Sequence, residues 1–417
     1  MKSDFYTQKV NLYNGIFFKN KNILLSHLDI ELTERCNNNC IHCCINLPAD
    51  DVAAQEKELS TQEVMEILKE AVSLGCMTVR FTGGEPLLRD DFKEIYVFAR
   101  KIGLRVIIFT NATLISPEHA ELFSSIPPLE KIEVSVYGMK KSSYEQVTRN
   151  PGSFELAFRG IKLLLENNIA FIVKSAILPP NKNEIDDFEK WALTIPWMDN
   201  LPSYSMFFDL RLRREEEKNI IIRKLRLKPE DGLSILLREK EKYLKSMKEF
   251  CSKFLSPPTK ELFSCGAGVK GGCVDAYGYF YPCLSCKHPQ LAYDLKNGCL
   301  EDALKKFFPK IRQFVAKNSD YLSRCARCFL KGMCQQCPAK SWSEDGSLDT
   351  PVEYYCQIAH TEARFLGLIK NDEVGWKIKD WQKRVAEILG NERRSNNETK
   401  KEKVVNSQTV FTAEDKS

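Results

Sequence analysis

Short β-rich runs alternate with amphipathic helices from about residue 25 to residue 210, and this alternation restricts the fold more than any other feature of the chain. In the first run, Leu28, Ile30 and Leu32 alternate with polar residues, as in a strand. Six βα units in succession predict a parallel sheet, which right-handed crossovers would either curl toward a barrel or wind flat. The six runs are SHLDIELT, TVRFT, LRVIIFT, KIEVSV, AFIVKSAIL and YSMFFDL.

Helix boundaries between these runs are marked by residues with a known capping function. Ser60 and Glu63 form a capping-box pattern, and the helix that follows ends at Gly75. Ser116 and Pro117 are placed as cap and first helical residue of another helix. Two further amphipathic helices are predicted from Asp90 to Ile102 and from Ser153 to Asn167.

Composition narrows the class of protein. The chain has 417 residues, enough for a large domain and a smaller one, and its net charge of only +5 gives no argument for nucleic acid. We find neither an apolar run long enough to span a membrane nor a secretion signal, so we expect a cytoplasmic protein without a membrane partner. Sixteen cysteines in such a chain are more often metal ligands than disulfides.

The sequence CNNNCIHC follows the first predicted strand directly and provides Cys36, Cys40 and Cys43. Closely spaced thiolates on a loop can hold one face of an iron-sulfur cluster. Three ligands leave one iron open, which distinguishes a catalytic metal centre from a closed structural one. Zinc with His42 as a fourth ligand is the rival interpretation, which we disfavour because the loop already fixes the direction of His42.

A second motif, TGGEP, ends the second predicted strand with Gly83, Gly84, Glu85 and Pro86. Glycines at such a place let the backbone approach a ligand closely, although a Gly-Gly turn alone can be only a loop. It lies about forty residues after the cysteine loop, and the two motifs together are unlikely to coincide by chance.

These two motifs resemble the signature of the radical S-adenosylmethionine (SAM) superfamily. The resemblance implies an α/β fold with a partial (β/α)6 barrel, in which the open iron of a 4Fe-4S cluster is chelated by SAM. An electron from the cluster then cleaves SAM to a 5'-deoxyadenosyl radical, which abstracts a hydrogen atom from substrate. TGGEP would hold the amino group of SAM, His42 would pack near the adenine, and Cys44 would be a neighbour of the cluster, not a ligand.

Further SAM contacts are suggested at the ends of the third and fourth strands and beyond. Thr110 with Asn111, and Ser135, occupy positions where barrel enzymes carry functional groups. By the resemblance, Ser135 would meet the ribose or carboxylate and Arg149 the carboxylate, which an arginine can clamp through two hydrogen bonds. Asn111 and Arg149 could equally be a turn and a cap residue. We assign no catalytic acid or base.

The downstream cysteines resemble a SPASM domain, which holds two auxiliary 4Fe-4S clusters in radical SAM enzymes that modify peptides and proteins. The resemblance assigns Cys325, Cys328, Cys334 and Cys356 to the outer cluster, and Cys265, Cys283 and Cys337 to the inner one. Cys273 is the first candidate for the fourth inner ligand, with Cys286 and Cys251 as alternatives; an open iron could instead bind substrate. A zinc ribbon is the rival interpretation of this region.

The predicted organisation follows from these segments. It comprises an N-terminal extension (1–24), the radical SAM core (25–210), a helical linker or insertion (211–260), a small cysteine-rich C-terminal SPASM domain (261–360), a C-terminal helical segment (361–390) and a disordered tail (391–417). The highly charged sequence after residue 211 is typical of a solvent-exposed face. The tail lacks the apolar pattern of a packed core.

The preferred function is modification of a peptide or protein substrate by a thioether or carbon-carbon cross-link, or a related oxidation. Partners would be a reductant such as flavodoxin or ferredoxin and, because few residues precede the first strand, a separate leader-peptide recognition protein. One alternative is formylglycine formation of the anaerobic sulfatase-maturase type, although Leu284 stands after Cys283 where an aspartate is expected. Modification of a haem or cofactor side chain is another, and an iron-sulfur electron-transfer protein is the non-enzymatic one.

Overall fold

The computed structural model describes residues 24–334 and 336–390. The predicted N-terminal extension up to residue 23 and the predicted disordered tail from residue 391 lie outside the described residues. The chain divides into two compact units. Unit 1 comprises the described residues through Leu227 with Leu262–Phe314 and Pro338–Leu348, and unit 2 comprises Lys228–Glu261, Val315–Cys337 and the residues from Asp349 onward. Each unit is described by itself.

Unit 1 is built on a sheet that, within the described residues, has nine strands in the order β11-β10-β9-β1-β4-β5-β6-β7-β8. The last six correspond to the six predicted runs and are all parallel to their neighbours, which confirms the α/β class and the succession of βα units. Only the first two residues of the sixth run, YSMFFDL, lie in a strand. They are β1 (His27–Thr33), β4 (Thr78–Gly83), β5 (Arg105–Thr110), β6 (Ile132–Ser135), β7 (Phe171–Ala176) and β8 (Ser203–Ser205).

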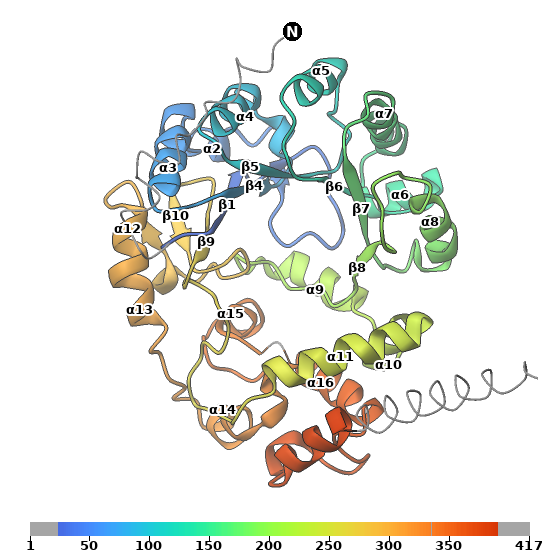
Figure 1. Ribbon diagram of the computed structural model, residues 1–417, viewed down its shortest axis with the longest axis vertical. Coiled ribbons are helices and arrows are strands. Elements are labelled where there is room, and N and C mark those ends of the chain that lie inside the picture. The colour runs from blue at the N-terminus through green and yellow to red at the C-terminus, as the bar shows by residue number, and fades with distance from the viewer. Residues whose placement is uncertain (1–23, 335, 391–417) are drawn as a thin grey trace, which may run out of the picture. The chain divides into compact units, whose positions relative to one another are not determined.

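Helices of unit 1 run along the outer side of this curved sheet (Figure 1). The Ser60–Glu63 capping box is present, and Ser116 caps a helix whose first residue is Pro117, as predicted. The apolar face of the first of these helices is buried through Val64, Ile67, Leu68 and Ala71. The helices on this side are α3 (Thr61–Ser73), α4 (Phe92–Lys101), α5 (Pro117–Ser125), α6 (Lys141–Thr148), α7 (Ser153–Glu166) and α8 (Ile185–Ala192). Unit 1 also contains α2 (Val52–Gln55), α9 (Glu216–Leu225), α12 (Leu300–Asp302), α13 (Phe308–Ile311) and α15 (Pro338–Asp345).

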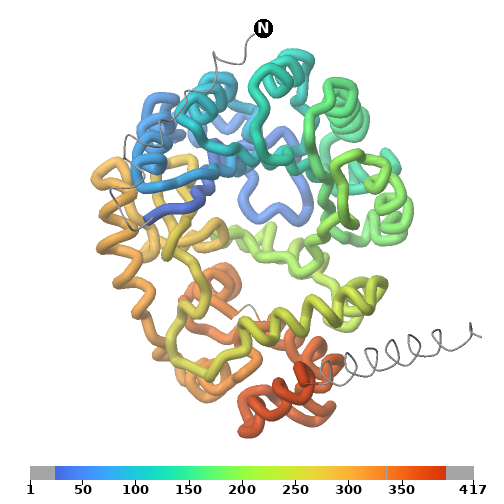
Figure 2. The backbone as a smooth tube through the Cα atoms, in the orientation of Figure 1, coloured from blue at the N-terminus to red at the C-terminus, as the bar shows by residue number. Residues whose placement is uncertain are grey.

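Part of the cysteine-rich region extends the same sheet. Strand β9 (Gly271–Val274) pairs parallel with β1, and β10 (Tyr279–Tyr281) and β11 (Tyr293–Asp294) continue it antiparallel. In Figure 2 the yellow and orange trace of this region lies beside the blue trace of β1. The segment DAYGYFYPC has a hairpin-like sequence, and β9 and β10 do pair antiparallel there. The pairing of β9 with β1, a strand more than two hundred residues away, was not predicted.

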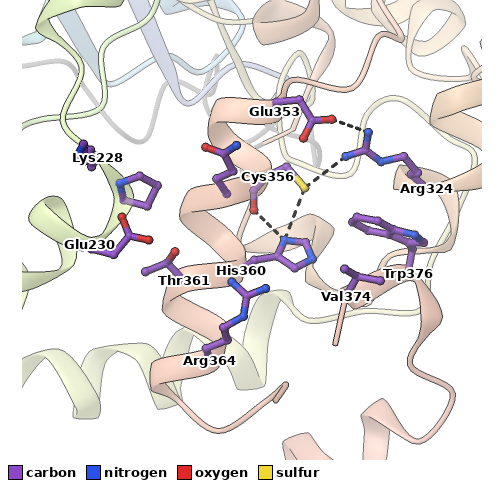
Figure 3. A pocket seen from close by; sticks show the side chains of 12 residues that line it. Lys228, Glu230, Arg324, Glu353, Cys356, His360, Thr361, Arg364, Val374 and Trp376 are labelled. Carbon is purple, nitrogen blue, oxygen red and sulfur yellow. Dashed lines mark hydrogen bonds and ion pairs between the residues drawn. The ribbon is translucent and has the colours of Figure 1, made fainter. Parts of the chain in front are cut away.

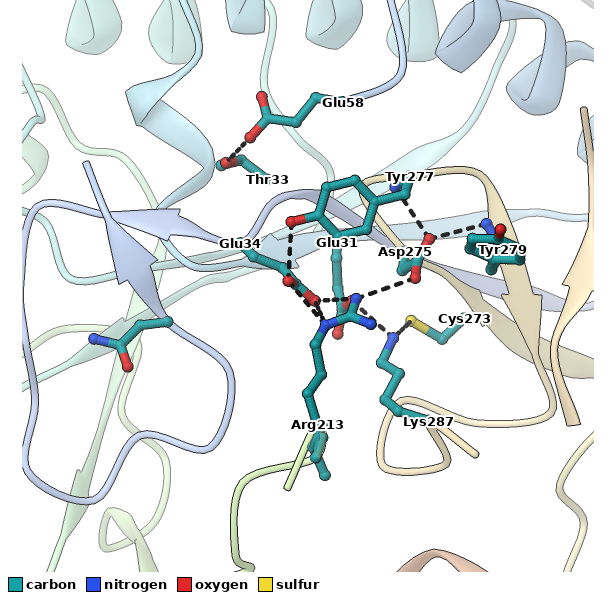
Figure 4. Close-up of polar contacts among 12 residues, drawn as sticks. Glu31, Thr33, Glu34, Glu58, Arg213, Cys273, Asp275, Tyr277, Tyr279 and Lys287 are labelled. Carbon is teal, nitrogen blue, oxygen red and sulfur yellow. Dashed lines mark hydrogen bonds and ion pairs between the residues drawn. The ribbon is translucent and has the colours of Figure 1, made fainter. Parts of the chain in front are cut away.

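A buried ion pair joins β1 to the segment that follows β10 (Figure 4). Lys287 Nζ lies 2.7 Å from Glu31 Oε2, and the two side chains are 1% and 0% exposed. Lys287 Nζ also lies 3.7 Å from Cys273 Sγ on β9. Burial raises the pKa of Glu31 to about 7, and the lysine charge opposes that rise. Because a buried charge without a partner is costly, this pair favours the observed packing of β9 against β1 over other arrangements.

Unit 2 is helical. Its principal helices are α10 (Pro229–Leu236), α11 (Lys240–Phe254), α14 (Ser319–Ser323) and α16 (Glu353–Phe365), joined by the single turns η8 (Cys325–Arg327), η9 (Phe329–Gly332) and η10 (Gly375–Lys377). Tyr243 of α11 contacts Phe365 of α16, with ring centroids 6.1 Å apart. Across the described parts of both units, none of the helices is long and apolar enough to cross a membrane.

Candidate active site

The first three cysteines lie on a loop that begins just beyond the carboxyl end of β1. Two short strands, β2 (Arg35–Cys36) and β3 (Leu47–Pro48), pair with each other and close the base of this loop, which we call the cysteine loop (residues 36–46). The amide of Cys43 donates to the carbonyl of Cys40 over 3.1 Å, so the chain turns between the second and third thiols. The carboxyl ends of barrel strands are where such enzymes carry their chemistry.

The thiols of the cysteine loop are desolvated. Burial raises the pKa of Cys36 to about 12 and that of Cys40 well above its usual value. The Glu85 carboxylate and Cys43 raise the pKa of Cys36 further, and Cys43 and Cys36 raise that of Cys40. Cys36 Sγ accepts hydrogen bonds from Asn38 N at 3.4 Å and from Asn111 Nδ2 at 3.8 Å. Since thiolate is the form that binds iron, the positive charge of a metal centre must supply the stabilisation that water does not.

Asparagines fix the first half of the cysteine loop. Asn150 Nδ2 donates to Asn37 O and to Asn38 Oδ1, both at 2.9 Å, and Asn37 Nδ2 donates to Thr113 Oγ1 at 2.7 Å. The amide of Asn39 donates to Thr148 O at 2.9 Å. Sequence reasoning missed these residues, although three consecutive asparagines between two candidate ligands are a signal for side chain to backbone hydrogen bonding.

Arg211 fixes the second half, and it was also missed. Its Nη1 donates to Cys43 O at 3.2 Å and to Asn46 Oδ1 at 3.0 Å, and its Nη2 donates to Asn46 O at 3.0 Å and Glu215 Oε1 at 2.6 Å. The amide of Leu212 donates to Cys44 O at 3.1 Å. Arg211 is 1% exposed, whereas the highly charged segment that contains it predicts a solvent-exposed face. Charge alone could not distinguish this arginine from its exposed neighbours.

The two glycines of TGGEP let the end of β4 approach the backbone that leads into the cysteine loop. A Cβ on Gly83 would stand 2.0 Å from Thr33 O, and one on Gly84 would stand 2.1 Å from Arg35 O. Gly83 also has a φ of +118°, which disfavours any side chain. Gly84 N donates to Thr33 O at 2.7 Å and Glu85 N to Arg35 O at 3.0 Å, so the two motifs are hydrogen-bonded together.

Glu85 ties TGGEP to the end of β5. Its carboxylate is 0% exposed and accepts from Thr110 Oγ1 at 2.8 Å, Asn111 N at 2.8 Å and Leu87 N at 3.1 Å. Burial raises its pKa to about 7, against the lowering effect of these donors. Asn111 in turn donates to Asn37 Oδ1 at 2.9 Å, which connects β5 to the cysteine loop. Pro86 begins the turn η3 (Pro86–Leu88) that Glu85 caps.

The remaining predicted SAM contacts lie at the same end of unit 1 but differ in burial. The ring of His42 packs against Tyr137 and Phe208, with centroids 5.1 and 5.2 Å away, and burial lowers its pKa to about 4. Ser135 is the last residue of β6. Arg149 is exposed and caps α6 with a φ of +51°, while its neighbours on each side bind the cysteine loop.

In unit 2, all four cysteines assigned to the outer cluster line one cavity. Cys325, Cys328, Cys334 and Cys356 share its wall with Arg324, Lys331, Gln336, His360 and Trp376. Burial raises the pKa of Cys334 well above its usual value, and Cys356, Cys325 and Cys328 raise it further, as expected where four thiols gather. This donor set fits a cluster held by four thiolates.

The cysteines assigned to the inner cluster are distributed over both units. Cys265 and Cys283 are in unit 1, on segments joined by a hydrogen bond from Gly268 N to Pro282 O of 2.9 Å. A hydrogen bond from the Cys286 thiol lowers the pKa of Cys283 to about 7. Cys273 is wholly buried on β9 beside Lys287, and burial raises its pKa. Cys337 belongs to unit 2, and the alternative Cys251 is buried there on α11.

No three Cys, His, Asp or Glu side chains are gathered around one point as for a single metal ion, within the part of the chain that the structure describes. An iron-sulfur cubane is larger than one ion, so its thiolates stand farther apart. The three thiols of the cysteine loop, fixed by asparagines and Arg211, fit such a cluster in number, type and rigidity.

Comparison with known proteins identifies the class. Residues 30–194 match the model of the radical SAM superfamily, and this range holds the cysteine loop and TGGEP. The chain contains a radical SAM domain. Proteins of this superfamily bind a 4Fe-4S cluster and SAM, so the class that the two sequence motifs indicated is confirmed.

The chain is similar to several proteins over most of its length. It is 25% identical over 344 residues to the AdoMet-dependent heme synthase of Methanosarcina barkeri, a match of 78% of this chain and 94% of that protein. SuiB of Streptococcus suis, bound to S-adenosylmethionine, shares the fold with a TM-score of 0.58 at 18% identity, covering 80% of this chain and 77% of SuiB. The structure of anSMEcpe with bound AdoMet has a TM-score of 0.51 at 17% identity, covering 88% and 98%.

Proposed function

We propose that this radical SAM enzyme modifies a peptide or protein, with Cys36, Cys40 and Cys43 holding the SAM-binding cluster and two auxiliary clusters held downstream. The first cluster would supply the electron that cleaves SAM, and the chain's own residues would orient SAM and exclude water. Gly83, Gly84 and the backbone of Glu85 would face the amino group, and His42 would pack near the adenine. Ser135, Asn111 and Arg149 are the further candidate contacts.

The observation that carries the proposal is the four-cysteine cavity of unit 2, formed by Cys325, Cys328, Cys334 and Cys356. A radical SAM enzyme needs only one cluster to cleave SAM. An additional cluster can accept the electron that remains when a cross-link forms, which suits oxidative modification of a peptide. SuiB and anSMEcpe, which share the fold, favour this class of substrate; one structure of anSMEcpe contains a Cp18Cys peptide.

The inner auxiliary cluster is proposed with Cys265, Cys283 and Cys337 as ligands and Cys273 as the first candidate for a fourth. The lowered pKa of Cys283 favours the thiolate that a cluster requires. Cys273 is already in contact with Lys287, which would offset part of the cost of burying its thiolate. A reductant such as flavodoxin or ferredoxin and a separate leader-recognition protein complete the proposed partners.

The test is to express the enzyme anaerobically with the short peptides encoded beside its gene and to analyse these peptides by mass spectrometry. The proposal predicts loss of two hydrogens from one peptide, with a new cross-link located by fragmentation. The matched control is the Cys36→Ala variant, which should leave the peptide unchanged. Unmodified peptides together with full SAM-cleaving activity would contradict the proposal.

A second candidate, modification of a haem precursor's side chains, is favoured by the match over 94% of a protein named AdoMet-dependent heme synthase. Anaerobic incubation with iron coproporphyrin III distinguishes the two. SAM-dependent conversion of this porphyrin, with every peptide untouched, would replace the first proposal by the second.

A further inference from the structure

Two side-chain nitrogens converge on one of the four cysteines of the cavity in unit 2 (Figure 3). Cys356 Sγ lies 3.8 Å from Arg324 Nη2 and 3.5 Å from His360 Nδ1. His360 stands one helical turn after Cys356 on α16, so the helix itself places its ring beside the sulfur. Helix α16 therefore fixes the contact of His360 with the sulfur, and Arg324, which directly precedes the turn η8, provides the second contact.

The hydrogen-bonding partners of His360 fix which ring nitrogen carries the proton. Gly375 N lies 3.0 Å from His360 Nε2, and a backbone amide can only donate, so Nε2 is the acceptor. The proton of the neutral ring is then on Nδ1, which lies 2.7 Å from Cys356 O and 3.5 Å from Cys356 Sγ. His360 is only 5% exposed, and its Nδ1 proton is shared between Cys356 O, the nearer acceptor, and Cys356 Sγ.

Arg324 is held in place on two sides. One of its terminal nitrogens pairs with Glu353, and its guanidinium lies over the ring of Trp376, 4.8 Å from the centroid. Trp376 also contacts the ring of His360, with centroids 5.4 Å apart. The positive charge is thus fixed beside the sulfur by an ion pair and an aromatic face, and is not left to a mobile side chain.

Cys356 lies on the wetter side of its cavity. It also lines a larger open pocket of about 430 Å³ with Arg324, Glu353, His360 and Trp376, whereas Cys328 and Cys334 are buried. Lys228 lines this pocket as well. Hydrogen bonds and positive charge at a ligating sulfur draw electron density from the cluster, stabilise its reduced state and raise its reduction potential.

We propose that Arg324 and His360 are positioning residues that raise the reduction potential of the outer auxiliary cluster through the sulfur of Cys356. This inference rests on the proposed function, because it requires the four-cysteine cluster. Neither residue touches substrate or SAM in this account.

The experiment is a redox titration followed by electron paramagnetic resonance on the reconstituted full chain, in a Cys36→Ala, Cys40→Ala, Cys43→Ala background that lacks the first cluster. The signal that Cys328→Ala removes is assigned to the outer cluster. Arg324→Gln and His360→Leu should each shift the midpoint of that signal to a more negative potential, and the double variant should shift it further. Arg324→Lys and His360→Asn, which each retain a donor, should shift it less.

Lys228→Gln is the matched control, because it removes a positive charge from the same open pocket without contacting the sulfur, and its midpoint should be close to that of the parent. An unchanged midpoint in Arg324→Gln and His360→Leu, at parental iron and sulfide content, would overturn the inference while leaving the cluster in place. If Cys328→Ala removes no signal and no iron, the outer cluster itself is absent and the inference fails with it.

Discussion

Arg211 holds the second half of the cysteine loop, because it binds the loop's backbone at Cys43 and Asn46. Replacing it with methionine removes these hydrogen bonds and leaves buried carbonyls without donors. We expect a loss of about 3–5 kcal/mol in unfolding free energy and poor loading of the first cluster. Chemical denaturation and iron content per chain measure the two effects.

Arg223→Met is the control for Arg211→Met, since Arg223 lies nearby on α9 but forms only a partly exposed ion pair with Glu216. Its loss should cost under about 1 kcal/mol. Equal effects of the two substitutions would show that the buried contacts of Arg211 do not hold the loop.

Glu85 gives a pH prediction. Its folded pKa of about 7 lies above the usual 4.5, so between these values the folded state binds a proton that the unfolded state lacks. Its contribution to stability is therefore full below the lower value and is lost as the pH rises through about 7. The change is about 3 kcal/mol at most. In Glu85→Gln, the unfolding free energy should fall less between pH 5 and pH 8 than in the parent. The control is Glu121→Gln, at an exposed position, in which it should fall as much as in the parent. A parental slope in Glu85→Gln would contradict this.

At the scale of elements, the contact between β4 and the start of the cysteine loop requires glycine. Gly83→Ala should lower stability by at least about 2 kcal/mol and reduce SAM cleavage, because its Cβ would overlap Thr33 O. Gly152 also has a positive φ, +85°, but nothing lies within 4 Å of its added Cβ. Gly152→Ala should therefore show only the backbone cost of about 1 kcal/mol. Thermal unfolding of both variants separates steric overlap from backbone strain.

The packing of β9 on β1 can be tested by a double-mutant cycle on Glu31 and Lys287. Lys287→Met leaves a wholly buried carboxylate without its cation and should cost about 3–5 kcal/mol. Adding Glu31→Leu removes the uncompensated charge, so the double variant should be more stable than Lys287→Met. A double variant less stable than Lys287→Met would contradict this account, because Glu31 would then stabilise the fold without its cation. Denaturation curves of the four proteins provide the cycle.

The elements that could be predicted depend on local sequence patterns, whereas those that could not depend on contacts with distant parts of the chain. Strand β1 and helix α3 were predicted because alternation and a capping box are local patterns. Strand β9 was not, since its four residues take their conformation from a distant partner, β1. The same holds in the site: the spacing of Cys36, Cys40 and Cys43 is visible in the sequence, whereas the role of Arg211 depends on a contact across 165 residues.

For the whole molecule, the sequence indicated a radical SAM enzyme through two motifs that the fold joins by hydrogen bonds between Thr33 and Gly84 and between Arg35 and Glu85. It could not indicate that residues 271–294 continue the sheet of unit 1, or that the four cysteines of unit 2 line one cavity with His360 and Arg324. Those features come from packing between segments that are far apart along the chain.

The most direct test of the central claim, a cluster held by Cys36, Cys40 and Cys43 that cleaves SAM, is anaerobic reconstitution followed by dithionite and SAM, with 5'-deoxyadenosine quantified by chromatography. The parent chain should form 5'-deoxyadenosine, and alanine at any one of these cysteines should abolish it, whereas Cys328→Ala should still form it slowly. An iron-loaded parent that forms none, or a Cys40→Ala variant that forms as much as the parent, would contradict the account.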